Sequence, residues 1–120
     1  MTALLIALAG ALGAVARFVV DGAVRRRGLD EFPWATLLIN VTGSLLLGVV
    51  TGLVLFRGRP DDLRLVLGTG FCGGYTTFST ATFETVRLAQ RGARLGAVGY
   101  TIGTVVLTVG AGALGLVAVR

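Results

Sequence analysis

The sequence contains neither histidine nor lysine, and Cys72 is its single cysteine. A lone cysteine cannot form a disulfide within the chain, and a chain without histidine cannot build a Cys/His metal site. These absences remove most of the support for metal-dependent hydrolysis and for histidine-based catalysis. We therefore expect a protein that is not an enzyme.

Charge is also scarce, because charged residues make up only 14% of the chain. All eleven basic residues are arginine, and the formal net charge is +5. The arginines gather at the ends of apolar segments, where contact with lipid headgroups explains them better than nucleic-acid binding. We expect membrane lipid as a partner and no nucleic acid.

Apolar residues dominate what remains: the chain is 54% hydrophobic, and its mean hydropathy is +0.85. This composition is typical of membrane proteins. The apolar runs predict four transmembrane helices over residues 2–20, 33–56, 63–88 and 95–119, which makes one all-α, multi-pass domain of the cell membrane over residues 1–120. No basic residue precedes the first apolar run, so we expect no cleaved signal peptide.

The third segment contains a stretch that a plain membrane helix does not need, GTGFCGGYTTFSTATFE at 68–84. Glycine costs about 1 kcal/mol per helical position relative to alanine. Four glycines within seven positions therefore predict a helix that breaks in mid-membrane, near residues 73–76, with a second half starting near Thr76. The amides at that start would favour a nearby anion. The alternative is a kinked helix whose glycines serve close packing.

Polar residues recur every four positions on the second and fourth segments, which aligns them on one helix face. They are Thr36, Asn40 and Ser44, and then Tyr100, Thr104 and Thr108. Amide and hydroxyl donors without a mid-membrane lysine or arginine describe a weak anion-binding lining, which suits conduction. Asn40 is either part of this lining or a hydrogen-bonding contact between two helices.

Arg17 and Glu84 are charged residues inside or near the apolar segments. Arg17 either extends to the headgroups or points inward, where it fixes a helix junction or draws anions to a vestibule. Glu84 is the only acid well inside a segment, and the plain interpretation of it is an ion pair with Arg87.

The charge bias across the membrane is weak. Four crossings would put six arginines of the first and third connections on one side (Arg25, Arg26, Arg27, Arg87, Arg91, Arg94) and four on the other (Arg57, Arg59, Arg64, Arg120). Such a chain inserts in both orientations. Two copies then form an antiparallel, dual-topology dimer with its two-fold axis in the membrane plane.

The chain resembles the Fluc (CrcB) family of fluoride channels along essentially its whole length. The resemblance depends on GAVAR (13–17), TLLINVTGSLLLG (36–48) and above all GGYTTFST (73–80). It implies antiparallel dimers with two pores, passive export of fluoride that relieves fluoride toxicity, and a central structural sodium ion held by backbone carbonyls at the helix break.

The resemblance also assigns roles by position. Asn40 matches the pore asparagine, and Phe78 matches the first of two pore phenylalanines. The polar track corresponds to Ser79, Thr80, Tyr100, Thr104 and Thr108. Thr36 and Glu84 match residues near the pore entrance, and Gly73 and Thr76 match the carbonyl donors to sodium.

One position departs from the family pattern, which usually reads TTFSTF. The second phenylalanine is replaced by Ala81, and Phe83 lies roughly 200° further around a helix. Either a homodimer of this chain conducts poorly, or the chain pairs with a paralogue that supplies the ring. The paralogue heterodimer is favoured, because the polar track survives beside the lost ring.

Three other interpretations stay open. A small multidrug-resistance transporter also has four crossings and inserts both ways, but its proton-coupled exchange needs a carboxylate in the first helix, where this chain has none before Asp21. A membrane assembly subunit without transport explains the packing glycines but not the polar stripes. The chain is also interpretable as a non-conducting partner subunit of a heterodimeric fluoride channel.

Overall fold

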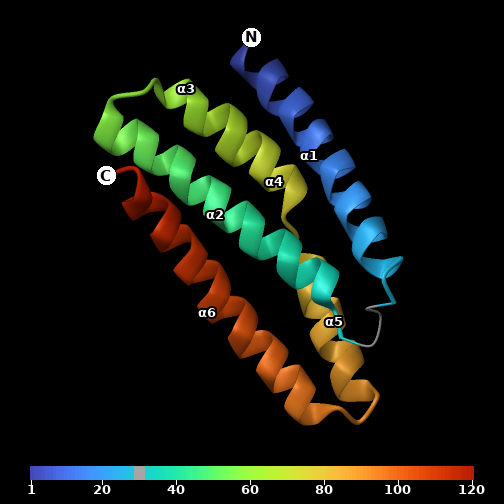
Figure 1. Ribbon diagram of the computed structural model, residues 1–120. Coiled ribbons are helices and arrows are strands. Elements are labelled where there is room, and N and C mark those ends of the chain that lie inside the picture. The colour runs from blue at the N-terminus through green and yellow to red at the C-terminus, as the bar shows by residue number, and fades with distance from the viewer. Residues whose placement is uncertain (29–31) are drawn as a thin grey trace.

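A computed structural model describes residues 1–28 and 32–120 of the chain, and within these residues every regular element is a helix. The elements are α1 (Thr2–Arg25), α2 (Trp34–Arg57), α3 (Asp61–Leu63), the π-helix η1 (Arg64–Cys72), α4 (Gly73–Tyr75), α5 (Phe78–Gln90) and α6 (Arg94–Ala118). Both termini lie at the end of the molecule opposite the α5–α6 connection (Figure 1). The helices therefore run roughly along one axis of an elongated molecule, 49 × 28 × 22 Å.

In the described part of the chain, three helices are long and apolar enough to cross a membrane. They are α1, α2 and α6, of 24, 24 and 25 residues, with mean hydropathies of 2.3, 2.1 and 1.9. About 20 apolar residues span a bilayer. Their outer faces expose large apolar side chains such as Leu12, Phe18 and Ile102. Hydrocarbon is the environment that suits such a surface.

The glycines serve close helix packing. A Cβ on Gly74 of α4 would overlap the Gly10 carbonyl of α1, and one on Gly13 would overlap the Phe71 carbonyl of η1. The α2–α6 pair packs in the same way, because a Cβ on Gly48 would overlap the Gly112 carbonyl. Small residues let membrane helices approach this closely. Within this chain these glycines therefore serve close helix packing.

The helical run that begins at Asp61 is interrupted at Thr76 and Thr77. Thr76 has φ −80° and ψ 162°, and Thr77 has φ −150° and ψ 117°, so both are extended. Gly73 and Gly74 remain helical, which places the interruption at and just after the end of the predicted interval 73–76. Thr77 then caps α5, because its Oγ1 accepts a hydrogen bond from the Thr80 amide at 3.2 Å.

The helix ends differ in part from the predicted segments. α1 continues past the predicted end at Val20 to Arg25, whose Nε lies 3.0 Å from the Asp21 carboxylate one turn earlier. α2 ends at a glycine with φ +62°, Gly58, and Gly92 with φ +84° turns the chain after α5. Residues 29–31 of the predicted first connection lie outside the described part of the chain.

Candidate functional site

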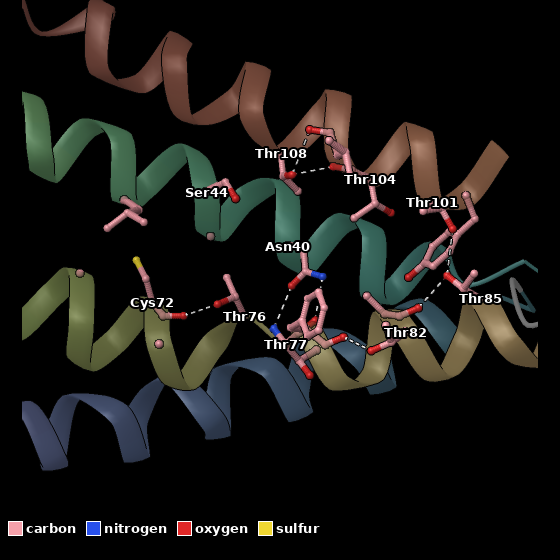
Figure 2. A pocket seen from close by; sticks show the side chains of 18 residues that line it. Asn40, Ser44, Cys72, Thr76, Thr77, Thr82, Thr85, Thr101, Thr104 and Thr108 are labelled. Atoms are coloured by element: carbon pink, nitrogen blue, oxygen red, sulfur yellow. Dashed lines mark hydrogen bonds between the residues drawn. The ribbon is translucent and has the colours of Figure 1, made fainter. Parts of the chain in front are cut away.

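A cavity of about 440 Å³ lies between α2, α6 and the interrupted helical run (Figure 2). Seven of the residues predicted for a site line it: Asn40, Gly73, Thr76, Phe78, Tyr100, Thr104 and Thr108. They come from separate stretches of sequence, so the fold brings together the second-segment stripe, the fourth-segment stripe and the interruption. Figure 2 shows Asn40 of α2, Thr76 at the interruption, and Thr104 and Thr108 of α6 around this cavity.

Asn40 is hydrogen-bonded to the backbone at the interruption of the helical run. Its Nδ2 donates to the Thr77 carbonyl at 3.0 Å, and its Oδ1 accepts from the Thr77 amide at 2.9 Å. A buried amide needs such partners. Asn40 is only 8% exposed, yet it also lines the cavity. Asn40 therefore makes a hydrogen-bonding contact between two segments of the chain and also lines the cavity.

This contact redirects a backbone hydrogen bond. In a continuous helix the Thr77 amide would donate to the Gly73 carbonyl, four residues earlier, but here it donates to Asn40. The Thr76 side chain does not replace the Thr77 amide as a donor to the Gly73 carbonyl, because Thr76 Oγ1 donates to the Cys72 carbonyl at 2.8 Å. Gly73 is exposed, and no atom lies within 4 Å of the point where its Cβ would be.

The stripe on α6 contributes hydroxyls whose hydrogen bonding is incomplete. Tyr100 is 1% exposed, and neither its hydroxyl nor the buried Thr104 Oγ1 makes a hydrogen bond of good geometry among the described residues, although the Thr104 and Thr36 side chains lie close enough to the Tyr100 hydroxyl to interact with it. Thr108 differs, because its Oγ1 donates to the Thr104 carbonyl at 2.6 Å. A buried polar atom without a partner is costly. Tyr100 and Thr104 are therefore the donors in this cavity most in need of a ligand.

Aromatic side chains are sparse around this cavity. Phe78, the first residue of α5, is 84% exposed and lies in the lining. Ala81, one turn later, also lines the cavity and packs against the buried cluster of Leu88, Ala97 and Tyr100. Phe83 is not in this lining, as its angular position predicts.

The remaining predicted residues lie elsewhere. A second cavity, of about 480 Å³, is lined by Arg17, Thr36, Ser79 and Thr80, together with Asp21 and Arg25. Within this chain Ser79 and Thr80 therefore line a different cavity from Tyr100 and Thr104. The reason is geometric: successive residues rotate by about 100° around α5, so Ser79 and Thr80 face away from Phe78. Thr77 lines both cavities.

Glu84 is buried at 7% exposure and lies in the lining of neither cavity. Its carboxylate is 3.8 Å from a guanidinium nitrogen of Arg87, as the sequence predicts, and equally 3.8 Å from one of Arg25 on α1. The Arg25 contact joins the ends of α1 and α5. Sequence reasoning missed it because it depends on tertiary packing.

Sequence reasoning also missed three hydroxyl residues that line the first cavity: Thr82, Thr85 and Thr101. Thr85 and Thr101 do not belong to a four-residue stripe, so no periodic signal marks them. They meet only because α5 and α6 lie side by side. Thr77 was missed for a different reason, because its role is carried by backbone atoms.

Comparison with known proteins identifies close relatives. Residues 4–116 match the family described as CrcB-like protein, Camphor Resistance (CrcB). The fluoride-specific ion channel FluC 1 of Leifsonia xyli subsp. xyli is 53% identical, over 97% of this chain and 85% of the relative. The fluoride-specific ion channel FluC of Nitrobacter winogradskyi is 48% identical, over 98% and 94%. FluC 2 of Cutibacterium acnes is 50% identical, over 97% and 95%.

Proposed function

Because the chain belongs to the CrcB-like family, we propose that it is a fluoride-selective channel through which fluoride leaves the cell passively, which relieves fluoride toxicity. It is a multi-pass membrane protein and not an enzyme. Support comes from relatives named as fluoride-specific ion channels that match it over nearly their whole length. The cavity chemistry supplies independent support.

The observation that carries the proposal is the pair of incompletely hydrogen-bonded hydroxyls on α6. Tyr100 and Thr104 present buried donors without a well-aligned hydrogen bond in a cavity with no lysine or arginine in its lining, and the nearest polar neighbours of the Tyr100 hydroxyl are the Thr104 and Thr36 side chains. A small, strongly hydrated anion needs several such donors to replace its water, and neutral donors bind weakly enough to release it. Asn40, the ring edge of Phe78 and Thr108 complete this part of the pathway.

The second cavity is the approach to the pathway. Arg17 draws anions towards it, and Thr36, Ser79 and Thr80 supply hydroxyls. Glu84, held between Arg25 and Arg87, lies near this entrance and fixes the end of α1 against α5. The polar residues to which the resemblance assigns roles thus act in two cavities, and Thr77 lines both.

The helical run from α3 to α5 is the third of four membrane crossings, and Thr76 and Thr77 break it in mid-membrane. Two chains associate as an antiparallel, dual-topology dimer with its axis at this break. The exposed Gly73 supports this arrangement, because its carbonyl loses the Thr77 amide as a helical donor and a backbone group without a partner needs one at membrane depth.

A structural sodium ion fits the donors at the break. Sodium is a hard cation that prefers oxygen ligands, and the described residues contain no cluster of acidic, histidine or cysteine ligands. The backbone carbonyls of Gly73 and Thr76, with the same pair from a second chain, would hold the ion. The diversion of the Thr77 amide to Asn40 supports this assignment, because it removes the usual helical partner of the Gly73 carbonyl. When bound, the ion joins the two chains.

Two dimers are compatible with Ala81. A homodimer has no second ring in either pathway, whereas a paralogue heterodimer takes one from its partner. Among the relatives, proteins named FluC 1 and FluC 2 both occur, which suits a paired arrangement. The multidrug-transporter alternative loses support, because the buried Glu84 carboxylate lies between two arginines rather than in a substrate cavity.

Removing the hydroxyls of Tyr100 and Thr104 should lower fluoride efflux without lowering stability. In Tyr100→Phe with Thr104→Val, fluoride efflux from proteoliposomes should fall by about tenfold or more, since a hydrogen bond to a charged group contributes about 1.5–3 kcal/mol. The melting temperature should stay level or rise, because an unsatisfied buried group is removed. Thr42→Val, which removes a hydroxyl bonded to Tyr75 at 2.9 Å outside this cavity, is the control. Unchanged efflux would show that these hydroxyls do not contact the permeating anion.

A further inference from the structure

A pair of hydroxyls lies at one end of the first cavity. Thr101 Oγ1 of α6 lies 3.2 Å from Thr85 Oγ1 of α5 and can donate to it. Both side chains line the cavity beside Ala81. Figure 2 shows the pair at the end away from Cys72 and Ser44, beyond Thr104 as seen from Asn40. The polar lining thus continues past the residues discussed so far.

Both hydroxyls are available to a ligand. Thr85 Oγ1 donates to the Ala81 carbonyl at 3.0 Å. The single hydroxyl hydrogen of Thr101 is directed either to Thr85 Oγ1 or to the Ala97 carbonyl, which lies 2.9 Å away. Each of these carbonyls lies inside a helix, where the backbone amide four residues later already bonds to it. A hydroxyl can therefore turn towards the cavity without leaving a carbonyl unbonded.

Ala81 leaves this pair uncovered. It precedes Thr85 by one helical turn, on the same side of α5, and its single methyl group lies partly buried against Leu88, Ala97 and Tyr100. A large side chain at this position would project into the space in front of the pair. The small residue and the two hydroxyls therefore form one local feature of the cavity.

We propose that Thr85 and Thr101 form a second anion subsite, which takes a small, hard anion of the fluoride class through two hydroxyl donors. Along α6 the subsite lies between the Tyr100 and Thr104 positions, on the side that faces α5, and it supplies polar contacts where Ala81 supplies no ring. This inference rests on the proposed channel function and deepens it. It predicts that the pathway has successive sites, which an ion needs in order to move on.

The test compares hydroxyl removal in two backgrounds. Thr85→Val with Thr101→Val keeps the shape of both side chains and should lower fluoride efflux from proteoliposomes by roughly tenfold. The matched pair Thr85→Ser with Thr101→Ser keeps both hydroxyls and should leave efflux within about twofold of the unmodified chain. In an Ala81→Phe background the ring covers the pair, so the valine substitutions should change efflux by less than about twofold. Equal losses in both backgrounds would indicate a merely structural role and overturn the subsite.

Equilibrium binding separates this inference from the channel proposal. Fluoride bound by purified protein in detergent, measured with a fluoride-selective electrode, should decrease in the double valine variant and not in Thr69→Val, which lies outside this cavity lining. If the unmodified chain binds or leaks fluoride and the double valine variant matches it, the subsite alone is wrong. If the unmodified chain neither binds nor leaks fluoride, the channel proposal fails, and the subsite fails with it.

Discussion

Asn40→Asp is expected to lower fluoride efflux by at least ~100-fold, because it puts a carboxylate where an anion must pass. Two like charges 4 Å apart repel by about 4 kcal/mol at an effective dielectric constant near 20. The substitution also removes the donor that Asn40 gives to the Thr77 carbonyl at 3.0 Å, while the acceptor for the Thr77 amide remains. Efflux is measured from proteoliposomes, and folding and oligomeric state are checked by size-exclusion chromatography.

The control for this variant is Asn40→Ala, which removes both contacts to Thr77 without adding charge. We expect Asn40→Ala to reduce efflux less than the aspartate variant does, and to lower the thermal stability more. Equal losses of efflux would mean that the contact with Thr77, and not charge in the pathway, explains both results. Undiminished efflux in a folded Asn40→Asp dimer would remove Asn40 from the pathway.

The second large effect concerns stability. Gly74→Ala should lower the melting temperature by roughly 5–15 °C, because overpacking costs about 1–3 kcal/mol. The added Cβ would overlap the Gly10 carbonyl, and a backbone group cannot move aside by changing rotamer. Melting is followed in detergent by the loss of the dimer peak or by circular dichroism.

Gly73→Ala is the matched comparison, since no atom from another part of the described chain lies within 4 Å of its Cβ position. Because the added methyl group meets no crowding within one chain, the Gly73→Ala variant should have a melting temperature close to that of the unmodified protein. A selective loss of dimer in Gly73→Ala, with helices intact, would support a second chain and a cation at this point. Equal melting temperatures for Gly74→Ala and the unmodified protein would contradict the packing described for α1 and α4.

Much of the site was predictable because helical periodicity is a strong signal. The four-residue spacing in α2 and α6 placed Asn40, Tyr100, Thr104 and Thr108 on common faces, and the structure gathers them around one cavity. The membrane composition likewise predicted the apolar helices α1, α2 and α6. These inferences depend only on local geometry and on solvent preference, which the sequence carries directly.

Other features needed tertiary contacts. The glycines of 68–74 suggested a break through their low helix propensity, but Gly74 is small because α1 lies against it. The interruption falls at Thr76 and Thr77, at and just after the end of the predicted interval, where Asn40 bonds to the amide and carbonyl of Thr77. The separation of Ser79 and Thr80 from Tyr100 depends on how α5 is rotated after the interruption. No local pattern fixes that rotation.

The most direct measurement is anion loss from liposomes that contain this chain alone, with a potassium ionophore to relieve the build-up of charge. Fluoride and chloride are followed in parallel by selective electrodes. We expect fluoride loss well above that of protein-free liposomes, with chloride retained. Chloride loss as fast as fluoride loss would contradict the selectivity, and an absence of fluoride loss, both alone and with a paralogue supplying the partner chain, would contradict the channel itself.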